Sequence, residues 1–188
     1  MNYFIKLTLF ILIILISTFA WADTISSPHI YITKFEFRDN YYFKMIPGKD
    51  FKDLGRGICY KITKNDTDEI LWRTNGWYSY EVHLSQDGKY LVRMGDWPSG
   101  EFNLNSKDIA VAFYKEGNLL KMYYTSDLIK NPSSVHHSIS HYQWRDYNEK
   151  NFNMKNNKFY LSTIEGITYI FDITTGNILD KIKSNEIE

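Results

Sequence analysis

The sequence is short of two things that would narrow its function: cysteine and an excess of charge of either sign. Its one cysteine cannot form an internal disulfide or a multi-cysteine zinc site. The 22 basic and 22 acidic side chains balance, so we expect no nucleic-acid partner, because nucleic acids attract proteins with a basic excess. A hydrophobic content of 44% is ordinary for a globular protein and excludes wholesale disorder.

Signatures of catalysis are also missing. The chain has no G-x-S-x-G elbow, no H-E-x-x-H zinc motif, no phosphate-binding loop and no G-x-G-x-x-G fingerprint. Cys59 lies in an alternating segment, Gly57 to Ile62, and we expect it inside a strand, because only Lys61 nearby favours a thiolate. These absences favour binding over catalysis, and no cofactor is predicted.

The first 22 residues have the pattern of a secretory signal peptide. Lys6 is followed by an apolar run, Leu7 to Ile16, and then by Ala20-Trp21-Ala22, the small–any–small pattern of a cleavage site. We therefore predict an exported protein, periplasmic or secreted, whose mature chain begins at Asp23 after cleavage following Ala22. Retention of this segment as a membrane anchor is the alternative, although a spanning helix needs about 20 apolar residues.

The residue pattern predicts short β-strands over most of the mature chain, residues 23–188. Tyr78 to Leu84 alternates apolar and polar residues, Ser85 to Gly88 supplies a turn, and Lys89 to Met94 returns as the second strand of a hairpin. Nine more strands are expected at Ile30–Phe37, Gly57–Thr63, Glu69–Arg73, Ile109–Tyr114, Leu119–Tyr124, His141–Arg145, Lys158–Thr163, Ile167–Asp172 and Ile178–Leu179. Strands at this short spacing predict a single all-β domain with about eleven antiparallel strands.

Two segments resemble β-propeller blades. Leu84 to Leu91 looks like the S-x-D-G-K-Y-L turn of WD40-like blades, and Thr168 to Leu179 is similar to the Y-x-x-D-x-x-T-G-x-x-L hairpin of pyrroloquinoline-quinone-enzyme-like blades. The resemblance implies a scaffold that binds proteins, sugars or cofactors on one face. Eleven strands are too few for a closed propeller of about four to eight four-stranded blades. We therefore expect an open propeller-like stack or a β-sandwich.

Aromatic side chains supply the first candidate site. Trp77 and Tyr78 follow Asn75-Gly76, and Trp97 follows Asp96, so all three lie near the open end of the predicted hairpin. Aromatic residues at loop mouths stack on sugar rings or anchor protein partners. The leading hypothesis is therefore a binding module for an envelope or extracellular protein or glycan. The alternative is that these rings close the ends of the core, as we expect of Trp144.

A histidine cluster supplies the second candidate. His136, His137 and His141 fall within six positions, and neutral imidazoles are good zinc, copper or nickel ligands. In an extended strand His137 and His141 would stand roughly 13 Å apart, too far for one ion, unless a turn at Ser138 brings them together. The alternative is a polar loop with hydrogen-bonded or solvated imidazoles.

The third candidate is a hydrolase site assembled from distant residues. Glu81 and His83 are expected on one face of a strand, with Arg93 across the hairpin and Asp96 close by. An acid, a base and a cation on one face can make an active site. The alternative is a solvated face with cross-strand ion pairs, in which Asp96 pairs with Arg93.

Overall fold

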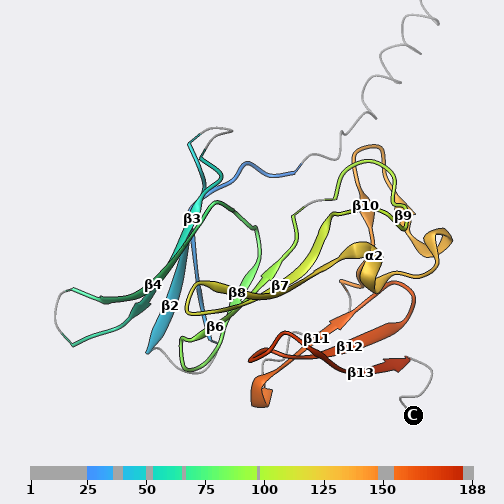
Figure 1. The fold of residues 1–188 in the computed structure, drawn as a ribbon. Coiled ribbons are helices and arrows are strands. Elements are labelled where there is room, and N and C mark those ends of the chain that lie inside the picture. The colour runs from blue at the N-terminus through green and yellow to red at the C-terminus, as the bar shows by residue number, and fades with distance from the viewer. Residues whose placement is uncertain are drawn as a thin grey trace, which may run out of the picture.

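The computed structural model describes residues 25–35, 40–49, 53–64, 67–96, 98–147 and 155–183, which form thirteen β-strands (Figure 1). The all-β prediction is confirmed, with two strands more than expected. The additional strands are β2 (Tyr41–Ile46) and β9 (His136–His137). Alternation does not reveal β2, because Lys44 is its only charged residue, and β9 is too short to show a period. The predicted signal peptide, residues 1–22, lies outside the described residues.

The strands form three antiparallel sheets and one small hairpin, and each follows the order of the chain. The first sheet contains β1 (Tyr31–Lys34), β2, β3 (Arg56–Lys61) and β4 (Glu69–Asn75). The second contains β5 (Val82–Leu84), β6 (Tyr90–Met94), β7 (Ile109–Lys115) and β8 (Asn118–Tyr124). The third contains β11 (Lys158–Ser162), β12 (Ile167–Asp172) and β13 (Ile178–Lys183). The hairpin pairs β9 with β10 (Tyr142–Gln143).

Little of the described chain is helical. A single α-helical turn, α2 (Thr125–Leu128), follows β8, and short 3₁₀ turns occupy Pro132–Ser134 and Lys155–Asn157. Among the described residues, none of the helices reaches the length and apolarity that a membrane span requires. Hairpin turns connect most neighbouring strands instead, and two of these turns contain glycines that no other residue could replace without strain.

Gly88 and Gly117 both adopt positive φ angles, 70° and 84°, which suit the tight turns between antiparallel strands. Gly117 also has no room for a side chain, because a Cβ atom there would lie 2.3 Å from the carbonyl oxygen of Arg73. The β7–β8 turn therefore packs directly against β4, which ties the second sheet to the first.

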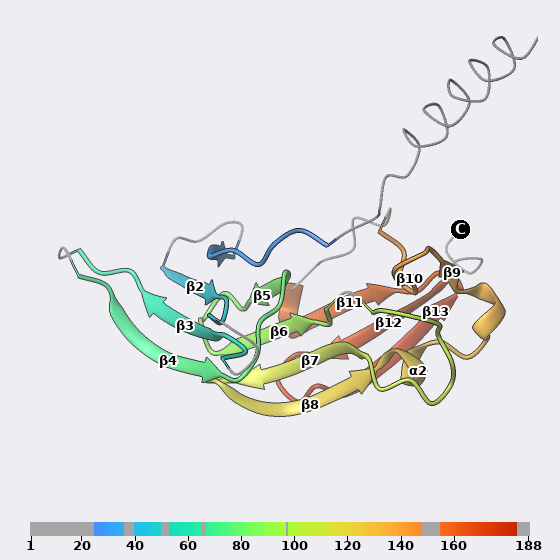
Figure 2. The same ribbon diagram turned by 90° about the horizontal axis from the view of Figure 1, so that it is seen from above.

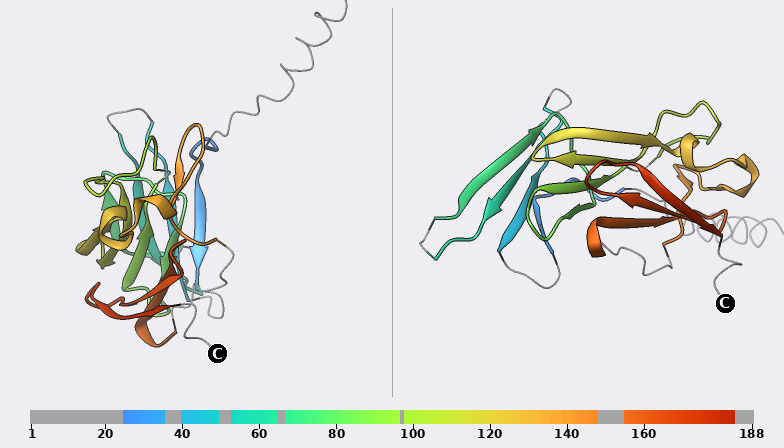
Figure 3. Two further views of the ribbon diagram at one scale, coloured as in Figure 1. Left: turned by 90° about the vertical axis from the view of Figure 1, so that its right-hand side faces the viewer. Right: turned by 60° about the horizontal axis from the view of Figure 1, so that its bottom comes forward.

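The second sheet lies between the other two, as Figures 2 and 3 show from three sides. Its strand β7 is buried on both faces, so apolar residues occupy successive positions instead of alternating with polar ones. Ala112 and Tyr114 belong to the core shared with the first sheet, whereas Val111 and Phe113 belong to the core shared with the third. The fold is therefore an open stack of sheets held by two separate hydrophobic cores.

The two cores are built differently. The core between the second and third sheets is rich in aromatic rings, and Phe113 lies 5.1 Å from Phe171 and 6.3 Å from Phe159 between ring centroids. The core between the first and second sheets contains Cys59 and Trp72, which both donate hydrogen bonds to the carbonyl oxygen of Gly88. Burial raises the pKa of the Cys59 thiol to about 12. The interior placement predicted for Cys59 is confirmed.

Several predicted strands are shorter than expected, among them His141–Arg145, which forms a strand only at Tyr142–Gln143. The alternating segment Tyr78 to Leu84 forms a strand only from Val82 onward, because Ser79 is buried and its hydroxyl bonds the carbonyl oxygen of Met94 at 2.7 Å. This side-chain bond replaces a backbone ladder bond. Tyr78 and Tyr80 consequently leave the sheet and contact the N-terminal segment.

Candidate functional site

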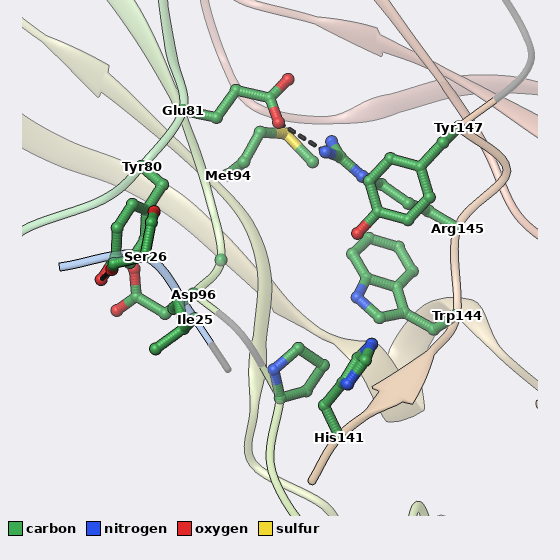
Figure 4. Close-up of a pocket in the computed structure, with 12 residues that line it drawn as sticks. Ile25, Ser26, Tyr80, Glu81, Met94, Asp96, His141, Trp144, Arg145 and Tyr147 are labelled. Atoms are coloured by element: carbon green, nitrogen blue, oxygen red, sulfur yellow. Dashed lines mark hydrogen bonds and ion pairs between the residues drawn. The ribbon is translucent and has the colours of Figure 1, made fainter. Parts of the chain in front are cut away.

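Segments far apart in the sequence meet in a cleft of about 220 Å³ beside the second sheet (Figure 4). Its lining residues come from four parts of the chain: Ile25 and Ser26; Tyr80 and Glu81; Met94, Gly95, Asp96 and Pro98; and His141, Trp144, Arg145 and Tyr147. One wall carries Tyr80 and Asp96, and the opposite wall carries Trp144 and Tyr147. We call this feature the cleft.

A partly buried ion pair lines the cleft. The Nη2 atom of Arg145 lies 2.5 Å from Oε2 of Glu81, and Nε2 of His83 lies 3.0 Å from Oε1 of the same carboxylate. Burial opposes ionisation of Glu81, but the hydrogen bonds from His83 and Arg145 outweigh it and lower the pKa of Glu81 to about 2. Glu81 is therefore a fixed negative charge with both oxygens engaged.

The third sheet holds the wall that carries Arg145. Arg145 bridges to Thr163 beyond the end of β11, and the amide of Ile164 donates to the carbonyl oxygen of Trp144 at 3.1 Å. Trp144 is 5% exposed and belongs to the aromatic core, which confirms its predicted interior position. Tyr147 is 62% exposed, and the guanidinium of Arg145 lies 4.4 Å from its ring centroid. This wall is thus rigid at its base and exposed at its rim.

The facing wall carries the second carboxylate. Asp96 is half-exposed, and its Oδ2 atom lies 3.6 Å from Nη2 of Arg93, the pairing expected from the sequence. Burial raises the pKa of Asp96, and the charge of Arg93 offsets this effect only in part. The two carboxylates of the cleft thus differ, because Glu81 is fully compensated and Asp96 is not.

The N-terminal segment, residues 25–30, closes one side of the cleft. Tyr80 donates a hydrogen bond of 2.7 Å to the carbonyl oxygen of Ser26, and Tyr78 bonds both the amide and the carbonyl of His29. These bonds reach backbone atoms, while the side chains of the segment stay exposed. Two tyrosines that sequence alternation places in a strand therefore position a wall of the cleft.

The loop aromatics predicted as a binding site have other contacts. The ring centroid of Trp77 lies 5.4 Å from that of Tyr114, and the guanidinium of Arg93 lies 4.6 Å from the ring centroid of Trp77. Neither Trp77 nor Tyr78 lines the cleft. The third predicted aromatic, Trp97, lies outside the described residues. The described pair therefore supports the core and the N-terminal segment.

The three clustered histidines occupy different settings. His136 and His137 are exposed on β9, whereas His141 lies in the turn before β10 and lines the cleft. The Nδ1 atom of His141 lies 2.6 Å from the hydroxyl of Ser138. Within the described ranges, no three His, Cys, Asp or Glu side chains gather in a way that could hold a metal ion. The geometry therefore gives the metal hypothesis no support.

The predicted acid–base trio is rearranged. Glu81 and Asp96 do line one cleft, and His83 bonds Glu81, but Arg93 pairs with Asp96 and is not the cation beside Glu81. Val82 lies directly opposite Arg93 across the hairpin, so Arg93 points to the face away from Glu81. Arg145, 64 positions further along the chain, takes the place expected for Arg93. A carboxylate held ionised by two partners serves as a fixed charge and is poorly suited to proton transfer.

Sequence reasoning missed Tyr80, Arg145 and Tyr147 as site residues. The available signal was the density of rings and charges from His141 to Tyr147, which includes Trp144 and Arg145 as neighbours. No protein-family model matches the chain, and a search of curated proteins finds no match. The cleft itself is therefore the basis for a functional argument.

Proposed function

We propose that this protein is an exported binding module whose ligand enters the cleft. The observation that carries the proposal is the convergence of the rings of Tyr80, Trp144 and Tyr147 with the Glu81–Arg145 pair around one cavity. Binding sites are typically concave and largely apolar, with a few convergent polar groups that fix the orientation of the ligand. Aromatic faces supply contact area, and the charged pair supplies directed hydrogen bonds.

The size of the cavity favours a single ring-sized group. Its volume of about 220 Å³ is smaller than the roughly 300–1,000 Å³ that accommodates a drug-sized ligand. A small molecule fits this space, as does one protruding group of a larger envelope or extracellular protein or glycan. Trp144 is held in the aromatic core, so little of its freedom is lost when a ligand packs on it.

Export is the second element of the proposal. It is supported by the signal-peptide pattern of residues 1–22, which precedes the described N-terminal segment by two residues. We expect the protein in extracytoplasmic fractions of its own cells to begin at Asp23, as measured by intact mass and N-terminal sequencing. Replacing Ala20 by Arg should abolish this processing, while Ser27→Arg serves as a control. A full-length chain beginning at Met1 in those fractions would contradict the cleavage.

Binding in the cleft can be measured with fluorine-labelled tryptophan. The full chain is titrated with three ring-sized probes, methyl α-glucopyranoside, phenol and cyclohexylammonium, while ¹⁹F NMR spectra are recorded. We expect at least one probe to shift the Trp144 resonance, which the Trp144→Phe variant identifies. The Trp72 resonance, assigned with Trp72→Phe, reports the other core and should stay constant. A Trp144 resonance that no probe shifts would contradict the proposal.

A further inference from the structure

We propose that the group recognised in the cleft is a compact organic cation of the alkylammonium type. This inference rests on the proposed function of the cleft and adds the charge of its ligand. Three features carry it: the balance of formal charges around the cavity, the placement of Asp96, and the rings on both walls. The ammonium group can belong to a free amine or to a lysine side chain of a protein partner.

The charged side chains that line the cleft carry a net negative charge. Glu81, Asp96 and Arg145 are the Asp, Glu, Lys and Arg side chains that line the cleft, so its formal charge is −1 with histidine counted neutral. The charge of Arg145 is matched by Glu81 at 2.5 Å. The net negative charge therefore belongs to Asp96, at the opposite wall.

Asp96 is incompletely compensated by its own protein partner. Its contact with Arg93 is 3.6 Å long, whereas strong charge-assisted hydrogen bonds measure about 2.7–2.9 Å. Arg93 is also drawn toward the ring of Trp77 and does not line the cleft. Burial raises the pKa of Asp96, and the charge of Arg93 lowers it only in part, in keeping with this long contact. A cation in the cleft would restore the balance.

The aromatic walls favour the same ligand. Tyr80 stands beside Asp96 on one wall, and Trp144 and Tyr147 stand across the cavity on the other (Figure 4). Ring faces attract cations through their quadrupole, and the attraction is larger where the cation is partly desolvated. An anionic group would meet the same rings and the incompletely compensated carboxylate of Asp96, so it is disfavoured on both counts.

Three probes of one shape and different charge test the inference: cyclohexylammonium, cyclohexanol and cyclohexanecarboxylate. Each is titrated into the full chain, and the Trp144 resonance reports binding. We expect the ammonium to bind about tenfold more tightly than the alcohol and the carboxylate to bind most weakly. Asp96→Asn should reduce the ammonium affinity about tenfold, to the level of the alcohol. Asp180→Asn, the same change at an exposed position on β13, should alter it less than twofold.

The outcomes separate this inference from the proposed function. Equal binding of the alcohol and the ammonium, with a shifted Trp144 resonance, would overturn the cation assignment and leave the cleft as the binding site. If none of the three probes shifts the Trp144 resonance, the cation assignment is overturned as well. Retained cyclohexanol binding shows that the Asp96→Asn variant is folded. The Tyr147→Leu variant should lose more affinity for the ammonium than for the alcohol. Nα-acetyl-lysine methylamide distinguishes the sources, because tighter binding than cyclohexylammonium assigns a protein side chain and weaker binding assigns a free amine.

Discussion

Two pairs of aromatic residues, Trp77 with Tyr78 and Trp144 with Tyr147, have similar chemistry and opposite settings. The first pair follows a glycine turn and looks exposed from its sequence, yet Trp77 packs on Tyr114 and lies beside Arg93. The second pair follows a short strand, yet it forms one wall of the cleft. Position relative to a turn thus does not decide which aromatic residues line a cleft.

The difference arises from what each pair is packed against. Trp77 borders the core between the first and second sheets, where neighbouring side chains occupy the available space. Trp144 and Tyr147 lie where the third sheet stops covering the second, and the N-terminal segment closes the remaining side. A cavity forms at this second place because four segments of the chain meet without filling it.

The largest expected change in stability comes from removing the guanidinium of Arg145, on the wall of the cleft that carries Trp144 and Tyr147. Arg145→Ala leaves Glu81 partly buried with one partner fewer, and breaking a buried pair costs about 3 kcal/mol of unfolding free energy. Urea denaturation measures this loss. The double variant Glu81→Gln with Arg145→Met should recover much of the stability, because no uncompensated charge remains. Equal losses in the single and double variants would show that the pair is not coupled.

Acidification should act on the same pair. The pKa of Glu81 in the folded protein is about 2, below its ordinary value of 4.5, so the unfolded chain binds the proton first. The contribution of Glu81, about 2 kcal/mol after allowance for partial exposure, is present above pH 4.5 and is lost as the pH falls toward 2. Urea denaturation between pH 6 and pH 2.5 measures it. The Glu81→Gln variant should have a flatter acid limb, and an identical slope would refute this role.

Matched substitutions of Trp77 and Trp144 test the different settings of the two aromatic pairs. Trp77→Phe and Trp144→Phe should each cost about 1–2 kcal/mol of unfolding free energy, because each removes buried ring surface. Only the Trp144 change should weaken binding of cyclohexylammonium, followed by isothermal titration calorimetry. If Trp77→Phe weakened binding as strongly, the predicted loop site would regain support.

The smallest effects are expected at the tyrosines that hold the N-terminal segment. Tyr80→Phe removes the hydrogen bond to Ser26 and should cost about 1 kcal/mol or less. Hydrogen exchange at the amides of residues 25–30 should become faster. Tyr78→Phe removes the bonds to His29 and should accelerate the same amides. Because Ser26 lines the cleft and His29 does not, only the Tyr80 change should reduce probe binding, by a few fold. Unchanged exchange in both variants would show that other contacts hold the segment.

The sequence predicts the fold class well, because hairpins are local. The turn at Gly88 and the alternation of Lys89 to Met94 lie within a few residues of each other, and the structure confirms that hairpin. Strand β2 escapes prediction because Lys44 is the only charged residue of Tyr41–Ile46, so its alternation is hard to recognise. The cleft escapes prediction because Glu81 and Arg145 are 64 positions apart and nothing local marks them as partners.

The amino-acid sequence by itself determined the all-β class, the hairpin that turns at Gly88 and the interior position of Cys59. Each depends on periodicity or turn residues that act over a few positions. Only the tertiary structure decided that Arg145 replaces Arg93 beside Glu81 and that Trp77 packs while Trp144 borders a cavity. These outcomes depend on how the sheets stack, and stacking is set by the summed burial of side chains contributed by distant parts of the chain.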